Sequence, residues 1–284
     1  MRVQALLQRI GQIARRGGGT QETFQPVLTD AVRFPYGPFR FRIQLPARMP
    51  YRILASTDLS HWTPIAEGIA GAEYEEYIDS EAFKFSYRFY RAQARAVSSV
   101  NVIGYASVAL PPGFSLIANP FDSGSNTVGH LITNWPDGTT LNKYDARLLR
   151  LTENELKDGK WTNPSEQLLQ GEGAIFFNPT DDYRSHSFVG EVAQGEMTTP
   201  IPSGFSLRGS LVPKPGNLYE DLQFPISEGD VIHIFDRDRQ KYVLYPFENG
   251  QWTAGAPILG IGESFWVAKA EPGNWIKHLL IESA

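Results

Sequence analysis

The chain has 284 residues, a net charge of −5 and no cysteine, together with 26 glycines and 20 prolines. The lack of cysteine excludes disulfides, a thiolate nucleophile, iron–sulfur clusters and cysteine-ligated zinc. Hydrophobic residues make up 42% of the chain, which is enough to bury a core, and the length predicts two or three turn-rich domains.

Residues 1–19 are predicted to form an amphipathic helix that ends in a glycine linker, Gly17–Gly19. Apolar residues recur there every three or four positions, which gathers them on one stripe. A helix of this length is only marginally stable alone in water, so its apolar stripe is expected to pack against another surface. The alternatives for this surface are the chain's own domain, another subunit and a membrane surface. If the arm docks on a partner, the docking residues are Val3, Leu6, Leu7, Ile10, Ile13, Arg9, Arg15 and Arg16.

The N-terminal segment does not have the pattern of a signal peptide. Its longest uncharged apolar stretch is Val3–Gln8, and Arg9 then interrupts what would be the apolar core of such a peptide. No stretch approaches the roughly 18 apolar residues that span a bilayer. We therefore expect synthesis in the cytoplasm and no transmembrane segment. The final location stays open and includes an exported or particle-borne assembly.

Residues 25–97 are predicted to form a small β-sandwich-like unit. Phe39, Phe41, Ile43 and Leu45 alternate with polar residues, which is the pattern of a half-buried strand. Residues 83–89 alternate in the same way. Between these stretches, residues 56–60 form a polar turn in which Ser56 or Asp58 accepts hydrogen bonds from backbone amides.

This unit resembles a β-sandwich-like module that recurs in large, mostly uncharacterised surface and secreted bacterial proteins. The resemblance covers about 60 residues and implies a spacer or interaction module with no catalytic residue. It rests on Tyr51, Ser56-Thr57-Asp58-Leu59, Trp62, Asp79 and Arg88-Phe89-Tyr90-Arg91.

An internal repeat at an offset of 91 residues dominates the remaining chain. Pro111 and Gly113–Leu116 reappear as Pro202 and Gly204–Leu207, and Gly171-Glu172 reappears as Gly262-Glu263. Each copy has short apolar runs between Gly and Pro turns, so we predict two β repeats, residues 101–197 and 198–284. They are either two domains or two halves of one pseudo-symmetric body. The pair resembles a duplicated β domain of the same bacterial proteins, which brings no known reaction with it.

Charge is distributed unevenly along the chain. The first 21 residues have four arginines and no acidic residue, residues 22–100 are neutral, and residues 101–284 have 13 basic and 22 acidic side chains. Nucleic-acid binding needs clustered positive charge. We therefore predict no nucleic-acid partner.

No catalytic or metal-binding constellation is evident. The Gly-Phe-Ser-Leu motifs lack the final glycine of a nucleophile elbow, so Ser115 and Ser206 are interpreted as structural. The five histidines are isolated, which predicts no metal and no cofactor. Glu172 and Glu263 are a possible glycosidase pair, but each follows a glycine before an apolar run, so capping of backbone amides is preferred. We predict that the protein is not an enzyme.

These features favour an all-β, non-catalytic structural or adaptor protein of a larger assembly, such as a surface layer, a phage-tail-like particle or a virion. It would meet a protein partner or a second copy through the N-terminal helix. The alternative is a carbohydrate-binding protein whose exposed aromatic rings stack on sugars, and it requires solvent-facing rings at Trp135, Trp161, Trp252 and Trp275.

Overall fold

The protein is all-β, as the sequence predicts. A computed structural model describes residues 24–35 and 37–281. The helical elements among these residues are the short 3-10 segment η1 (Ala82–Lys84) and the one-turn helix α2 (Val128–Leu131). The expected helix of residues 1–19, with its eight docking residues, lies outside the described residues. No helix of the described part is long and apolar enough to cross a membrane.

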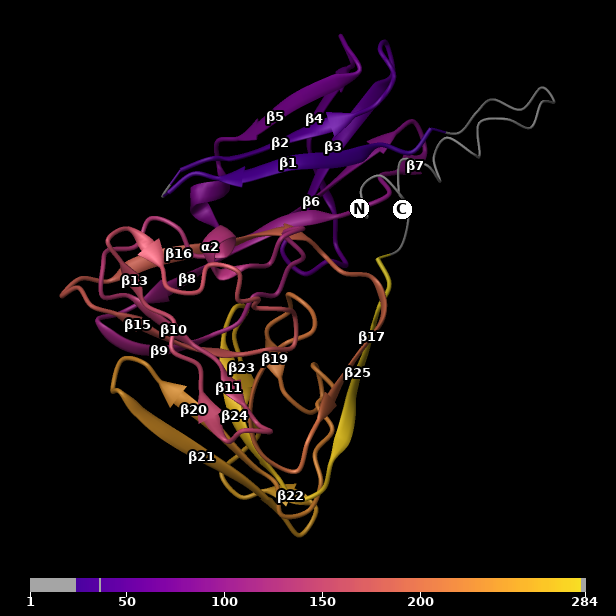
Figure 1. The fold of residues 1–284 in the computed structure, drawn as a ribbon. Coiled ribbons are helices and arrows are strands. Elements are labelled where there is room, and N and C mark those ends of the chain that lie inside the picture. Colours follow the sequence, from indigo (N-terminus) through magenta and orange to yellow (C-terminus); the bar gives the residue numbers. More distant parts are fainter. Residues whose placement is uncertain (1–23, 36, 282–284) are drawn as a thin grey trace.

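The N-terminal module is a sandwich of two antiparallel sheets (Figure 1). The first sheet has the order β1 (Val27–Arg33), β2 (Phe39–Gln44), β5 (Tyr74–Asp79). The second has the order β16 (Arg184–Glu191), β8 (Ile103–Leu110), β6 (Tyr87–Ala94), β3 (Pro50–Ser56), β4 (Thr63–Ile69), and β7 (Val97–Ser98) pairs with β6.

The sequence pattern holds in β2, where Phe39, Phe41 and Ile43 are fully buried. In the turn after β3, Ser56 Oγ accepts hydrogen bonds from the backbone N–H of Asp58 and Leu59, which confirms the predicted capping. The strand predicted from residue 83 begins later, at Tyr87. Residues 82–84 instead form η1, whose first carbonyl, that of Ala82, accepts a hydrogen bond from Tyr105 Oη at 2.6 Å.

The module and the following chain share one sheet. Strands β8 and β16 belong by sequence to residues 101–197, yet β8 pairs with β6 of the module. A continuous hydrophobic core also runs from Leu59 and Phe89 of the module to Trp275 and Leu279 near the C-terminus. The expected boundary at residues 97–101 is therefore bridged by strand pairing and by packing.

Residues 101–197, the first half, and residues 198–284, the second half, contain further sheets. The first half has a three-stranded sheet with the order β10 (Thr140–Asn142), β15 (Ala174–Asn178), β9 (Gly113–Ile117). It also has two hairpins: β11 (Tyr144–Asp145) pairs with β12 (Arg150–Leu151), and β13 (Leu156–Lys157) pairs with β14 (Lys160–Trp161). The second half has a five-stranded sheet with the order β18 (Gly204–Gly209), β24 (Ser264–Lys269), β20 (Val231–Asp236), β21 (Lys241–Glu248), β22 (Gln251–Trp252). In addition, β19 (Gly216–Asn217) pairs with β23 (Ile258–Leu259), and β17 (Gly195–Ile201) pairs with β25 (Gly273–Leu279).

Strand pairings of the first half recur in the second half at an offset of 91 residues. Gly113 pairs with Asn178, and Gly204 pairs with Lys269. Leu141 pairs with Phe176, and Ile232 pairs with Val267. The hairpins agree as well, since Tyr144 opposite Leu151 corresponds to Phe235 opposite Tyr242.

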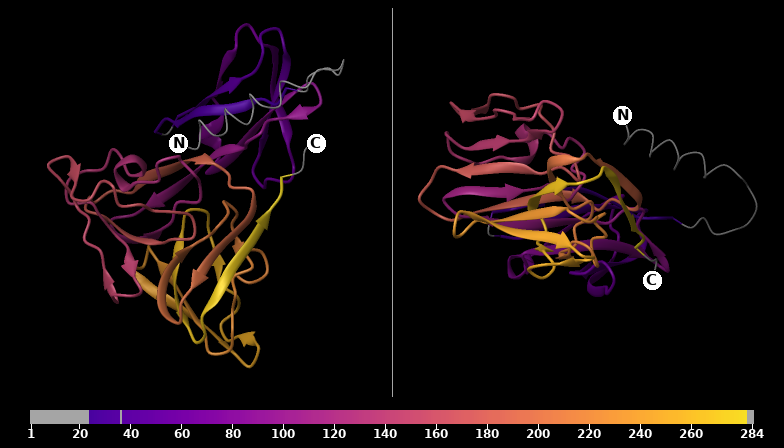
Figure 2. Two further views of the ribbon diagram at one scale, coloured as in Figure 1. Left: turned by 45° about the vertical axis from the view of Figure 1, so that its right-hand side comes forward. Right: turned by 90° about the horizontal axis from the view of Figure 1, so that it is seen from below.

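The contacts between the two halves are reciprocal. Ile117 bridges to Glu263, and the residues equivalent to these two, Arg208 and Glu172, bridge to each other. Likewise the Ala118 N–H donates to Gly262 O at 2.9 Å, while the Gly209 N–H donates to Gly171 O at 3.3 Å. Such an exchange of roles is the property of a two-fold interface. Figure 1 and the left view of Figure 2 show the module at one end of the molecule and the second half at the other.

The glycine before each repeated glutamate allows this close approach. Gly171 and Gly262 have φ of +83° and +80°, a region that disfavours other residues. A Cβ at Gly262 would stand 2.5 Å from a methyl carbon of Val108, and one at Gly171 would stand 2.9 Å from Leu211. The glycine of each repeated Gly-Glu pair is therefore required by the contact between the halves.

Candidate functional site

In each half, a β-hairpin reaches the outer strand of the other half's sheet. The hairpin of β20 and β21 lies against β9, and the hairpin of β11 and β12 lies against β18. The second hairpin also reaches β24, the neighbour of β18, through an edge-on stack of Tyr144 on Trp266 with ring centroids 4.8 Å apart. The two positions are equivalent under the 91-residue offset, so they can be compared residue by residue.

At the first position, the hairpin tip fills the space beside β9. Gln240 pairs with the backbone of Phe114: Oε1 accepts from the Phe114 N–H at 2.8 Å, and Nε2 donates to the Phe114 carbonyl at 2.9 Å. Arg237 donates to the Ala109 carbonyl at 2.8 Å and forms an ion pair with Glu263. We call this position the closed cleft.

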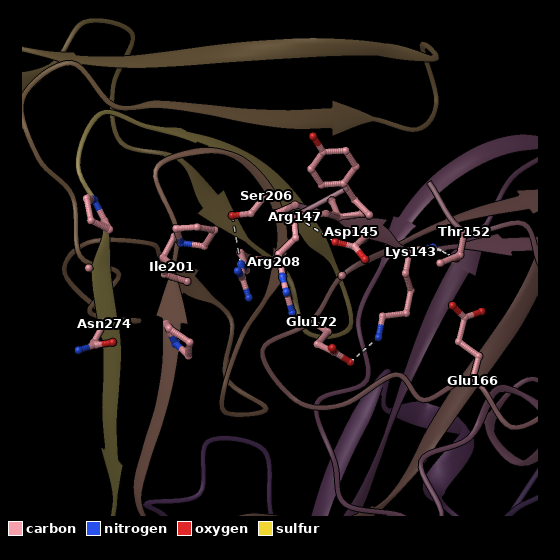
Figure 3. A pocket seen from close by; sticks show the side chains of 18 residues that line it. Lys143, Asp145, Arg147, Thr152, Glu166, Glu172, Ile201, Ser206, Arg208 and Asn274 are labelled. Atoms are coloured by element: carbon pink, nitrogen blue, oxygen red, sulfur yellow. Dashed lines mark hydrogen bonds and ion pairs between the residues drawn. The ribbon is translucent and has the colours of Figure 1, made fainter. Parts of the chain in front are cut away.

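At the second position, the hairpin tip leaves a cleft of about 810 Å³ beside β18, which we call the open cleft (Figure 3). Under the offset, Arg237 is replaced by Ala146 and Gln240 by Leu149. A methyl group and an isobutyl group cannot donate the hydrogen bonds that fasten the closed cleft. Glu172 and Pro200, which correspond to Glu263 and Ala109, remain in the wall of the open cleft.

The carboxylates of the open cleft are already engaged by donors of the chain. Glu172 accepts hydrogen bonds from Lys143 Nζ and the Leu169 N–H, each at 2.8 Å. Glu263 is held in the same way by the Gly260 N–H at 2.9 Å, so both glutamates cap backbone amides as the sequence predicts. Asp145 accepts from the N–H groups of residues 147 and 148, and these bonds lower the pKa of its carboxyl group.

Neither of the two guanidinium groups in the open cleft forms an ion pair with a carboxylate among the residues that the structure describes, although the charges of Asp145 and Arg147 and of Glu172 and Arg208 act on each other. Arg147 is exposed at the hairpin tip, and Arg208 is half-buried on β18. Arg208 donates from Nε to Ser206 Oγ at 3.1 Å, and Figure 3 draws this bond beside the Lys143–Glu172 pair. Burial lowers the pKa of Arg208, while the charge of Glu172 raises it. A guanidinium group that forms no ion pair keeps its donors for the oxygen atoms of an anionic ligand.

An aromatic slot of about 300 Å³ adjoins the open cleft, with Tyr144 in both walls. Its remaining walls are Phe205, His233, Tyr242 and Trp266. Phe205 is 50% exposed and Tyr242 is 43% exposed, so apolar surface is presented to solvent here. Burial lowers the pKa of His233.

The tryptophans named for sugar stacking lie elsewhere. Trp135, Trp161 and Trp275 are 9%, 7% and 1% exposed. Two of them anchor the core through the indole N–H, which Trp161 donates to Ile132 O at 3.0 Å and Trp275 to Leu222 O at 2.8 Å. Trp252 is half-buried and packs edge-on against Phe247. Trp135, Trp161 and Trp275 therefore offer no ring face to a sugar, because core side chains cover them.

Sequence reasoning missed Arg208, Arg147 and the pair of Ala146 and Leu149. It relied on identities between the repeats, and these residues stand where the repeats differ: Arg208 corresponds to Ile117, and Leu149 corresponds to Gln240. A comparison of mismatched positions would have singled them out. Ser115 and Ser206 are buried in the body and carry no exposed hydroxyl, being 1% and 2% exposed.

The open cleft thus has three basic side chains, Lys143, Arg147 and Arg208, and three acidic ones, Asp145, Glu166 and Glu172, in its lining. Apolar and aromatic surface lies beside it. In the described residues, no group of three or more His, Asp or Glu side chains is arranged to hold a metal ion. No protein-family model matches the chain, and no curated protein matches it either.

Proposed function

We propose that the protein is a non-catalytic structural or adaptor protein of a larger assembly. The observation that supports this is the continuous sheet from β4 to β16, which joins the module to the body by strand pairing instead of a linker. Together with the shared core, this makes a stiff body suited to holding a partner at a fixed position. The open cleft gives that body a place to bind.

We further propose that residues 101–197 and 198–284 are two copies of one β unit. The support is the recurrence of strand register at the 91-residue offset and the reciprocal contacts between the halves. In this interpretation the two clefts were equivalent at first. One has since been closed by the chain's own side chains, and the other is left to a partner.

The N-terminal arm is proposed as the second attachment point. Deleting residues 1–19 is expected to lower the sedimentation coefficient of the native assembly and to abolish co-purification of its partner, because the deletion removes the apolar stripe that would dock on that partner. The matched control is Leu6→Glu with Ile10→Glu in the full chain, which keeps the arm's length but interrupts its stripe. Unchanged association of both variants would contradict docking by the arm.

A second candidate function is carbohydrate binding, favoured by the solvent-facing aromatic slot. Tyr144, Phe205 and Trp266 present rings of the kind that stack on sugars. We expect Phe205→Ala to remove any signal on a glycan array without changing the melting temperature by more than a few degrees, since Phe205 is half exposed. An array without signal for the unaltered protein would rule this candidate out.

A further inference from the structure

We propose that the open cleft binds an extended acidic peptide segment. The peptide main chain would pair with Phe205 on the outer edge of β18, and its carboxylates would meet Arg147 and Arg208. The proposal names the partner chemistry for the adaptor function above and in that respect rests on it. It concerns the open cleft and not the N-terminal arm, so peptide binding by the cleft and docking by the arm can fail separately.

The edge of β18 has unpaired backbone groups. β18 is the outer strand of its sheet, next to β24. Leu207 O accepts from the Gly173 N–H, and the Gly209 N–H donates to Gly171 O, so both residues direct these groups away from β24. Backbone direction alternates along a strand, so Phe205 directs its N–H and C=O the same way. The described residues provide no partner for these two groups of Phe205, whereas the groups of Leu207 and Gly209 are already bonded to residues 171 and 173. The edge therefore offers one residue, Phe205, for pairing with an added strand.

The closed cleft shows which chemistry satisfies such an edge. There the equivalent residue, Phe114, has both backbone groups bonded by the amide of Gln240. The Gln240 amide supplies one acceptor and one donor, which bond the N–H and the C=O of the edge residue. A residue of an extended peptide presents its own C=O and N–H in the same arrangement. Leu149 replaces Gln240 in the open cleft, so the amide must come from another molecule.

The charges beside the edge select an acidic peptide. The carboxylates of Glu172 and Asp145 accept hydrogen bonds from donors of the chain. Arg208 and Arg147 lie near these two carboxylates but have no carboxylate as a hydrogen-bond or ion-pair partner in the described part. Acidic side chains of a peptide lying along β18 would supply that partner. Leu148 and Leu149, which are 59% and 73% exposed at the rim, offer the peptide's apolar side chains a contact.

The test is selection from a displayed library of random octapeptides. One arm uses the full-length protein, and the other uses a graft variant in which Ala146→Arg and Leu149→Gln copy the residues that fasten the closed cleft. We expect peptides enriched on the unaltered protein over the graft variant to be rich in Asp and Glu, and their affinity to fall at least tenfold in the graft variant. A lack of enrichment over the graft variant, or enrichment of basic peptides, would overturn the proposal.

Two further measurements guard against misfolding and against binding by charge alone. Arg147→Glu, at an exposed position, is expected to weaken the selected peptide at least tenfold, while Lys160→Glu, an equal charge change outside the cleft, leaves its affinity unchanged. N-methylation of the peptide one amide at a time should weaken binding at least tenfold at one position only, the amide that donates to the Phe205 carbonyl. Equal effects of the two charge variants, or the absence of such a position, would overturn the proposal. Loss of peptide binding without loss of assembly would leave the adaptor function standing.

Discussion

Replacing Asp230 by asparagine is expected to lower the free energy of unfolding by about 3–5 kcal/mol. Asp230 is fully buried and forms an ion pair with Lys269, whose side chain is also buried. Lys269 Nζ donates in addition to Pro225 O at 2.8 Å, and Asp230 accepts from the Ala270 N–H at 2.8 Å. The substitution leaves an ammonium group in the core without a counter-charge, and urea denaturation at pH 7 measures the loss.

The first half supplies the control for this pair. Thr139 and Asn178 occupy the equivalent positions, and both are buried without charge. Asn178 Nδ2 donates to Leu110 O at 3.1 Å, so the neutral pair is fastened by hydrogen bonds. The double variant Asp230→Thr with Lys269→Asn should therefore recover most of the stability that Asp230→Asn loses. Equal instability of the single and double variants would contradict the explanation by an uncompensated charge.

Local patterns predicted the fold class well. Alternation in residues 39–45 indicated a half-buried strand, and the glycine before Glu172 and Glu263 indicated turns that these carboxylates cap. Both features depend on residues close in sequence. The shared sheet was not predictable in this way, because β8 pairs with β16 about 80 residues later and no local pattern encodes that distance.

The candidate site was harder to predict for a different reason. It depends on a difference between two otherwise equivalent hairpins, Gln240 against Leu149, and on the edge of β18 that this difference leaves unpaired. The carbohydrate hypothesis named the tryptophans because their flat rings can stack on sugars, and the sequence does not show whether such rings are exposed. Three of them are core residues, since a large ring stabilises the fold more when buried, provided that its N–H finds an acceptor: a carbonyl for Trp161 and Trp275, and His186 Nδ1 for Trp135.

Stability is expected to fall as the pH decreases from about 6.5 to 4, and His186 carries part of that loss. The side chain is buried beside Trp135 and Phe188, and burial lowers its pKa to about 4. The unfolded chain, with an ordinary histidine pKa near 6.5, takes up a proton that the folded chain refuses. The contribution of His186 is thus fully present above pH 6.5 and is lost towards pH 4, at about 1.4 kcal/mol per pH unit and up to about 3 kcal/mol.

His186→Gln isolates this contribution from the other titrating groups. Glutamine keeps an acceptor for the Trp135 indole N–H, which lies 3.4 Å from His186 Nδ1, but it takes up no proton. The variant should be less stable than the unaltered protein at pH 7.5 and should lose about 3 kcal/mol less between pH 7.5 and 4. His130→Gln, the same substitution at an exposed position on α2, should leave the stability at pH 7.5 unchanged, because this side chain is not packed in the core. Denaturant titrations at each half pH unit measure this loss of stability. If His186→Gln loses as much stability as the unaltered protein between pH 7.5 and 4, His186 is not the group that resists protonation.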